Sequence, residues 1–224
     1  MMIRIKIIGL ISLLFFAISC DFKAKDNKSE NQSGDKISIE YLEDFTVFNN
    51  HEQVEAYFGS ENVEKSKWYE NEGTVEYEVT VVNPETKNKI IVFWRSDNQS
   101  YTGFYGVEAV HSPYNISTWE LIEEEGKTIP SKSGLKIGDN LKTIEKINKG
   151  PFSFWGLGWD FGGFVVLSSE KLKNYLVRVD LPEKFYETNF EETMPIMGEV
   201  KINSDDPSIS KFPIQIFSIR YIKE

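Results

Sequence analysis

Few side chains in this sequence are suited to covalent or acid–base chemistry, and their types restrict what that chemistry could be. There is one cysteine, Cys20, and there are two histidines, His51 and His111. A single thiol excludes a disulfide within the chain, and two imidazoles exclude a histidine-rich zinc site. We expect structural roles for both histidines, with His51 solvated in the first turn of a predicted helix. The sequence therefore predicts no catalytic residue, no metal site and no cofactor.

Carboxylates are the one plentiful reactive group. Glu123-Glu124-Glu125 and Asp205-Asp206 are the visible runs. Adjacent residues of a strand point to opposite faces, so neither run by itself presents the facing pair that glycoside hydrolysis requires. The sequence also lacks a glycine-rich phosphate loop and the HExxH and GxSxG motifs. We interpret both runs as solvated charge and predict that the protein is not an enzyme, with a carboxylate-based hydrolase as an alternative.

Cys20 stands at the end of a segment organised like an export signal. Arg4 and Lys6 are the only charges before Asp21, and an apolar run covers residues 7–17. This run is about half the length that a membrane-spanning helix needs. The pattern Ala17-Ile18-Ser19-Cys20 resembles the signal of bacterial lipoproteins. The resemblance implies that residues 1–19 are removed and that Cys20 is lipidated; the alternative is an ordinary secretory signal with an incidental cysteine.

Residues 20–36 are predicted to be a flexible tether between this anchor and the folded part. After Cys20 the segment holds four basic and four acidic residues and almost nothing to bury, a composition typical of disordered chain. The lipid would attach the protein to a membrane of the bacterial cell envelope. Inner membrane, outer membrane and cell surface are all compatible with the sequence.

The net charge argues against nucleic acid as a partner. The whole chain has 25 basic and 35 acidic residues, and removal of residues 1–19 leaves 23 basic and 35 acidic, a net charge of −12. Binding to phosphate backbones needs clustered lysine and arginine.

Beyond residue 37 a pattern repeats with an offset of 90 or 91 residues. Residues 45–59 and 135–151 each begin with alternating apolar positions and continue with a helix-capping Asn or Asp. Apolar residues at helical spacing follow, and each copy then reaches a glycine that can end the helix. Trp68 and Gly73 follow in the first copy, and Trp159 and Gly163 follow at corresponding places in the second. We predict a duplication; the alternative is two unrelated short helices that each begin a β-meander.

Most of the remaining sequence is β-like. Residues 75–81 alternate between apolar and polar side chains, and residues 90–94 form an apolar run after a turn. Further strands are predicted over residues 106–112, 117–122, 163–168, 175–181, 197–202 and 214–221. We predict an α+β fold of two tandem units, 37–130 and 131–224, each a short helix packed on an antiparallel β-meander. This order of elements is similar to that of beta-lactamase inhibitor protein and of small lipoproteins of the outer-membrane assembly machine, with no functional residue carried over.

The segment 152–164 is rich in aromatic residues and glycine. Exposed rings of Trp155 and Trp159 beside Asp160 would suit stacking on a sugar or contact with a partner's side chains. The alternative is that the aromatic residues, Phe152, Phe154, Trp159 and Phe161 among them, fill the core. Parts of residues 134–163 resemble a segment of uncharacterised envelope lipoproteins of Bacteroidetes type, which supports an envelope location.

Three functional hypotheses follow from these patterns. We favour a non-catalytic binding or assembly module that is anchored by lipid and presents a sheet face to another envelope protein. A surface glycan-binding lipoprotein that uses segment 152–164 is the first alternative, and the carboxylate-based hydrolase is the second.

Overall fold

A computed structural model describes residues 37–95 and 100–223, and residues 37–224 group as one unit. The predicted signal (1–19), the lipidation site Cys20 and the tether (20–36) lie outside the described residues. The α-helices are α1 (His51–Phe58), α2 (Leu141–Asn148) and α3 (Glu183–Thr193). Short 3-10 helices are η1 (Leu42–Val47), η2 (Ser60–Asn62), η3 (Glu170–Leu172), η4 (Met194–Ile196) and η5 (Pro207–Ile209). The strands are β1 (Val63–Glu70), β2 (Val75–Val82), β3 (Asn88–Trp94), β4 (Phe104–His111), β5 (Ser153–Trp155), β6 (Val165–Val166), β7 (Tyr175–Asp180), β8 (Lys201–Asn203) and β9 (Gln215–Ile222).

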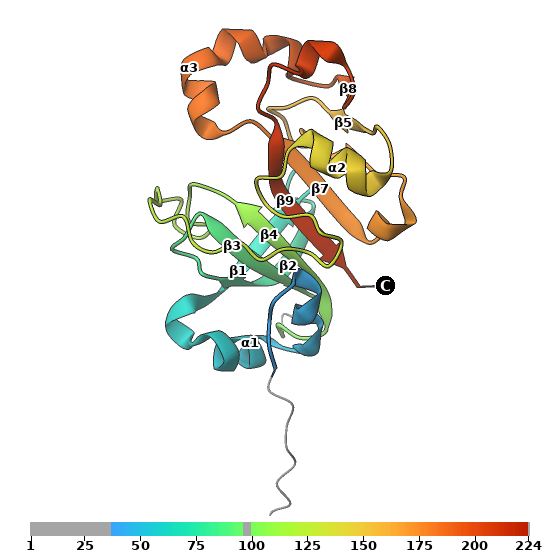
Figure 1. Cartoon of the computed structure of the whole chain (residues 1–224). Coiled ribbons are helices and arrows are strands. Elements are labelled where there is room, and N and C mark those ends of the chain that lie inside the picture. Colours follow the sequence, from blue (N-terminus) through green and yellow to red (C-terminus); the bar gives the residue numbers. More distant parts are fainter. Residues whose placement is uncertain (1–36, 96–99, 224) are drawn as a thin grey trace, which may run out of the picture. The chain divides into compact units, whose positions relative to one another are not determined.

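Two antiparallel sheets organise these strands. The larger sheet has the order β1-β2-β3-β4-β9-β7, and the smaller has the order β6-β5-β8. Figure 1 shows the larger sheet running through the molecule, with α1 at one end and α2 and α3 toward the other. Together with the helices, this arrangement confirms the predicted α+β class.

The larger sheet crosses the boundary predicted at residue 130. Strands β1 to β4 form a meander within 37–130, and β4 then pairs with β9 of the second half, with Val107 opposite Tyr221 and Ala109 opposite Ile219. The two halves therefore do not each keep a separate sheet. Pairing β4 with β9 satisfies the backbone groups of what would otherwise be an exposed edge in each half.

The helices that begin the two halves are capped in the same way. Asn50 caps α1 by accepting a hydrogen bond from the backbone N–H of Gln53, and Asn140 caps α2 by accepting one from Thr143. The residue before each cap is fastened to a central strand segment, since Asn49 accepts from Gly103 and Asp139 accepts from Ile216. The two halves meet where β4 pairs with β9.

Several local predictions differ from the structure. Residues 117–122 form no strand, because a turn precedes them. The side-chain oxygen of Asn115 holds this turn by accepting hydrogen bonds from the backbone N–H groups of Ser117 and Thr118. Helix α2 ends at Asn148, and the left-handed conformation that follows is taken by Lys149 rather than by the expected glycine, Gly150. His51 is buried rather than solvated, because α1 lies against the sheet.

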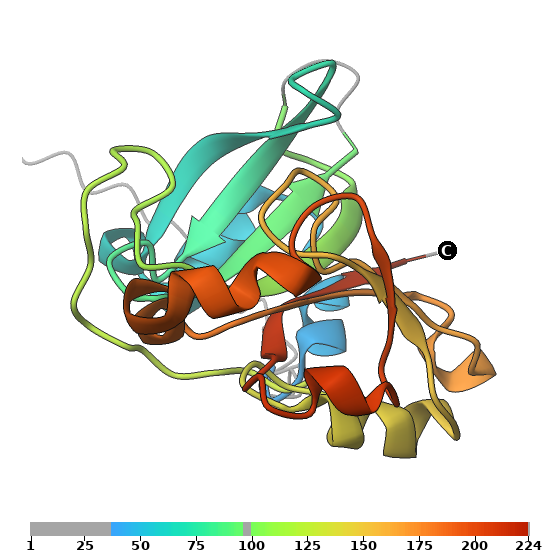
Figure 2. The ribbon, with the colours of Figure 1, turned by 90° about the horizontal axis from the view of Figure 1, so that it is seen from above.

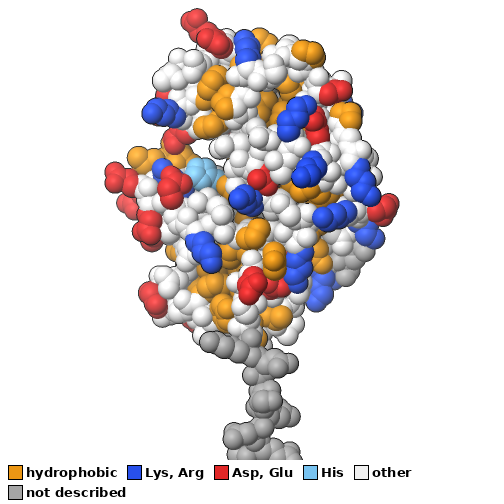
Figure 3. Space-filling view, viewed as in Figure 1, with side chains coloured by type: hydrophobic (Ala, Val, Ile, Leu, Met, Phe, Trp, Pro, Cys, Tyr) orange, Lys and Arg blue, Asp and Glu red, His pale blue; other side chains and the backbone are white. Residues whose placement is uncertain are grey.

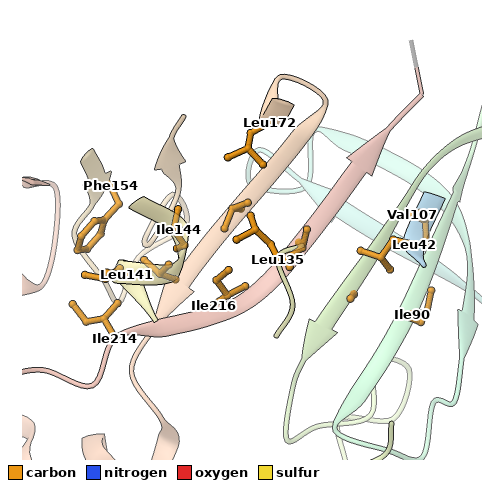
Figure 4. Packing of buried hydrophobic residues seen from close by; sticks show 14 of the residues in the cluster. Leu42, Ile90, Val107, Leu135, Leu141, Ile144, Phe154, Leu172, Ile214 and Ile216 are labelled. Atoms are coloured by element: carbon orange, nitrogen blue, oxygen red, sulfur yellow. The ribbon is translucent and has the colours of Figure 1, made fainter. Parts of the chain in front are cut away.

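The main core lies on the face of the sheet that the helices cover. Alternate strand residues, such as Ile90 and Val107, point to this face and meet Leu42 of η1. Figure 4 shows that the same cluster continues under α2, where Leu141 and Ile144 approach strand β9. One hydrophobic cluster therefore joins both halves.

The smaller sheet is attached to the larger one at Gly163. The backbone carbonyl of Gly163 accepts a hydrogen bond of 2.9 Å from Val179 of β7, and Phe164 forms a β-bridge with Arg178. Gly163 has φ +75°, and a Cβ atom there would lie 1.9 Å from the Val179 carbonyl oxygen. Only glycine allows this approach of the two sheets.

We predict that Gly163→Ala destabilises the fold by at least about 3 kcal/mol, because backbone strain and overpacking add at this position. Gly73→Ala is the matched control, since Gly73 has φ +82° with no atom within 4 Å of its Cβ position. Its expected cost is about 1 kcal/mol. Urea denaturation followed by tryptophan fluorescence measures both, and equal losses in the two variants would contradict the contact with Val179.

Candidate functional site

The sheet has a second face, opposite the helices, which we call the open face and define by Trp68, Phe93, Glu108, Arg178 and Arg220. Successive strand residues point to opposite faces, so the neighbours of the core residues lie here. Glu108 and Arg220 lie directly opposite each other in the β4–β9 register. The open face therefore carries side chains from both halves of the chain.

Part of the open face is covered by the segment that follows β4. Ile116 packs on a second hydrophobic cluster, and Ser117 donates a hydrogen bond of 2.8 Å to the Glu64 carboxylate. The buried members of this cluster are Val79, Val81, Ile91, Phe93 and Val110. The segment thus protects the apolar part of the open face and leaves hollows beside it.

The first hollow, which we call the hairpin hollow, has a volume of about 320 Å³. Its walls are the β1–β2 hairpin on one side and the loop 160–164 on the other, and Figure 2 shows this hairpin projecting from the sheet. The lining residues are Trp68, Tyr69, Glu70, Asn71, Glu72, Gly73, Glu108, Asp160, Phe161, Phe164, Leu176, Arg178, Ser218 and Arg220.

Arg220 organises the floor of the hairpin hollow. Its Nε and Nη2 atoms lie 2.8 and 2.7 Å from Oε2 of Glu108, and Nη1 lies 2.5 Å from Oε1 of Glu70. The Ser218 hydroxyl donates to the other oxygen of Glu108, and the guanidinium lies 4.0 Å from the ring centre of Phe93. Glu108 is only 4% exposed and Arg220 7%, so this network is formed away from solvent and is charge-assisted.

Arg178 lies beside this network in a different environment. Its guanidinium is held between the rings of Phe164 and Phe217, at 4.8 and 5.0 Å from their centres. It donates to the backbone carbonyls of Gly162 and Asp160, and no carboxylate of the described residues lies within 4.0 Å. Burial lowers the pKa of Arg178. The residue fastens the 160–164 loop over the sheet.

The second hollow, the loop hollow, adjoins the first and has a volume of about 870 Å³. It lies between β1 and the segment 112–119, and it shares Trp68 and Tyr69 with the hairpin hollow. Trp119 at its rim is 76% exposed and has φ +60°, a conformation that is strained for a large side chain. Its backbone N–H donates to the carbonyl of Asn115, which holds this turn in place.

Lys89 is a fully buried cation on the same face of the sheet. Its Nζ donates a hydrogen bond of 2.9 Å to the backbone carbonyl of Ser112, at the start of the covering segment. Burial lowers the pKa of Lys89 to about 8, and Glu85 and Glu64 oppose this shift.

Of the residues predicted to contact a ligand, Asp160 lines the hairpin hollow, whereas Trp155 and Trp159 lie outside its lining. Trp155 is 37% exposed, but its ring meets that of Trp159 edge-to-face at 88°. The Trp159 indole donates to the Gly156 carbonyl. The two indoles therefore do not form the flat platform that stacks on a sugar ring.

The other aromatic residues of segment 152–164 divide between core and surface. Phe152 and Phe154 are buried in the main core, as the alternative interpretation expected. Phe161 is exposed and lines the hairpin hollow, which differs from that expectation. Its position follows from the tight loop that Arg178 holds over the sheet.

The histidines and the carboxylate runs lie away from the hairpin hollow. His51 Nδ1 contacts the Thr80 hydroxyl at 2.9 Å, and His111 Nδ1 contacts the Asn88 side chain at 3.0 Å. Burial lowers the pKa of both imidazoles. The runs 123–125 and 205–206 are exposed. Within 37–95 and 100–223, no three His, Cys, Asp or Glu side chains gather in a way that could hold a metal ion.

Sequence reasoning missed most of this site. Glu70, Glu108, Arg178 and Arg220 come from four different strands, and none belongs to a motif. The one available signal was the occurrence of Glu108 and Arg220 within otherwise apolar strands, because a charge in such a strand is expected to have a partner.

Comparison with known proteins finds no matching family model, no matching curated protein and no matching solved structure. The helices of the described residues are all too short or too polar to cross a membrane.

We predict that Arg220→Met lowers the free energy of unfolding by about 3–5 kcal/mol, because Glu108 would be left as a buried carboxylate without its cation. The double variant Arg220→Met/Glu108→Gln should recover part of this loss. Lys67→Met is the control, since it removes an ion pair with Glu76 whose side chains are about 40% exposed, and it should have a far smaller effect. Urea denaturation measures all three, and similar losses for Arg220→Met and Lys67→Met would refute a structural role of the network.

The burial of Lys89 leads us to predict that the stability of the fold changes with pH in a specific range. Because its pKa is lowered in the folded state, the unfolded chain binds more protons between pH 8 and 10.5, and the Lys89 contribution to stability rises with pH over this range. At pH 7, Lys89→Met should therefore be the more stable protein, by up to about 3 kcal/mol before the loss of the hydrogen bond to Ser112 is counted. The difference in the free energy of unfolding between Lys89→Met and the unmodified protein should shrink from pH 8 to 10.5, as measured in a series of urea denaturations. A constant difference would show that Lys89 is not desolvated.

Proposed function

We propose that this protein is a lipid-anchored protein of the bacterial cell envelope that acts as a non-catalytic binding or assembly module, with the open face as its partner surface. The observation that carries the proposal is the continuity of the two hollows. They share Trp68 and Tyr69 and together extend across β1 and the loops on both sides. Adjoining concave surfaces with aromatic rims are typical of sites that receive protein side chains.

The chemistry of the open face supports binding rather than turnover. Glu70 and Glu108 are both bridged by the guanidinium of Arg220, so they do not face each other across a water-filled gap as the carboxyl pair of a glycoside hydrolase does. Among the residues that the structure describes, neither histidine is hydrogen-bonded to a carboxylate. The charged side chains on the floor of the hairpin hollow instead form ion pairs and hydrogen bonds with one another, which keeps the surface in one conformation before a partner arrives.

Exposed aromatic side chains supply the contact area. Trp119 and Tyr114 are exposed at the loop hollow, and Phe161 is exposed at the hairpin hollow. Such rings bury large apolar areas on association and lose few rotamers.

The proposed anchor determines where this surface works. A lipid on Cys20 would hold the folded unit on a tether of sixteen residues, with an r.m.s. reach of roughly 20–25 Å from the membrane. The partner would then be a protein of the same membrane or of the adjacent envelope space. Lipidation rests on the resemblance of residues 1–20 to lipoprotein signals.

Site-specific photocrosslinking in the producing cell tests the proposal. The photoreactive residue p-benzoylphenylalanine replaces Phe161 or Trp119 on the open face, or Tyr57 on α1 as a matched exposed position on the helix face. We expect one envelope protein to be crosslinked from positions 161 and 119 and not from 57. Equal crosslinking from position 57, or none from 161 and 119, would refute the open face as the partner surface.

The anchor is tested with the same strains. Cys20→Ser should lose incorporation of labelled palmitate and should weaken or remove the crosslink, because the protein no longer stays at the membrane. Incorporation of the label into Cys20→Ser would contradict lipidation at this residue.

A further inference from the structure

We infer that the hairpin hollow receives a basic side chain, the guanidinium of an arginine or the ammonium of a lysine, from the partner protein. This inference rests on the proposed function and names the chemistry of the partner. Three independent features carry it: the distribution of charge along the chain, the charges that line the hollow, and its aromatic walls.

The net charge of the protein is concentrated in one half. Residues 37–130 contain 6 basic and 18 acidic side chains, a net charge of −12, whereas residues 131–224 contain 13 of each. Figure 3 shows one face of the molecule, on which acidic side chains gather toward the left edge and basic side chains lie mainly toward the right. The β1–β2 hairpin belongs to the acidic half, so the field around the hollow favours the approach of a cation.

The lining of the hollow is acidic after its internal pairs are counted. Glu70 and Glu108 share the single cation of Arg220, and Arg178 is the one other base in the lining. Glu72 and Asp160 stand on opposite walls, and among the described residues neither carboxylate forms an ion pair. Four carboxylates against two guanidinium groups leave a charge of −2. A carboxylate ligand would be repelled by this negative charge, whereas a basic ligand would neutralise it.

The walls are suited to a cation with an apolar stem. The rings of Trp68, Phe161 and Phe164 line the hollow. A guanidinium or ammonium group binds to aromatic faces, and the methylene groups of its side chain pack on their edges. The same face already uses this interaction internally, since Arg220 lies over Phe93 and Arg178 lies over Phe164. A volume of about 320 Å³ has room for one such side chain.

A nuclear magnetic resonance titration of the folded protein tests this inference without the natural partner. The probes are acetyl-(Arg-Gly-Gly)3-amide and its counterparts with citrulline or glutamate in place of arginine. We expect the arginine peptide alone to shift the indole N–H resonance of Trp68 and the amides of residues 160–164. Glu72→Gln and Asp160→Asn should each weaken binding about three-fold or more, and Glu124→Gln, at an exposed site outside the hollow, should leave it unchanged.

Each other result overturns the inference. Shifts with the glutamate peptide alone would make Arg178 the receptor of an acidic side chain. Equal shifts with arginine and citrulline would mean that charge is not recognised, and no shift at millimolar peptide would exclude a basic side chain from this hollow. Crosslinking from position 119 in cells would still support the open face in any of these cases, so the two proposals fail separately.

Discussion

The pairing of β4 with β9 is the interaction on which the other features of this structure depend. Each half of the chain builds antiparallel strands and a capped helix, but each half alone would leave a central strand unpaired on one side. When β4 and β9 pair, the backbone groups of both edges are satisfied and one hydrophobic cluster extends from η1 to α2. The register places Ala109 opposite Ile219 in the core and Glu108 opposite Arg220 on the open face. A shift of one residue would exchange these two sets.

The open face is thus a product of the same register that builds the core. Arg220 of β9 reaches Glu108 of the neighbouring strand and Glu70 of β1, so the two halves are joined by charge on one face and by apolar packing on the other. The hollow between the hairpin and loop 160–164 exists because Arg178 and Gly163 hold that loop against β7. Structural groups form its floor, and unpaired carboxylates and rings form its rim.

This separation of floor and rim explains why binding is the function that the geometry favours. Groups that are already paired and buried keep their shape, whereas exposed rings and free carboxylates gain contacts when a partner arrives. The acidic half carries the hairpin, so electrostatic attraction and the shape of the hollow would act on the same part of the partner. A short tether would keep this surface near the membrane and would raise the local concentration of any partner anchored there.

The sequence by itself determined the features that depend on near neighbours. Helix caps at residues 49–50 and 139–140, the apolar spacing of both helices and the alternation in β2 act within a few residues, and the α+β class follows from them. Segment 152–164 was recognisable as unusual, and Asp160 within it does line the hollow. Only the tertiary structure decided that Glu70 meets Arg220 across 150 residues of sequence. Such pairs depend on strand order and register, which are set by the packing of the whole sheet and leave no local pattern to read.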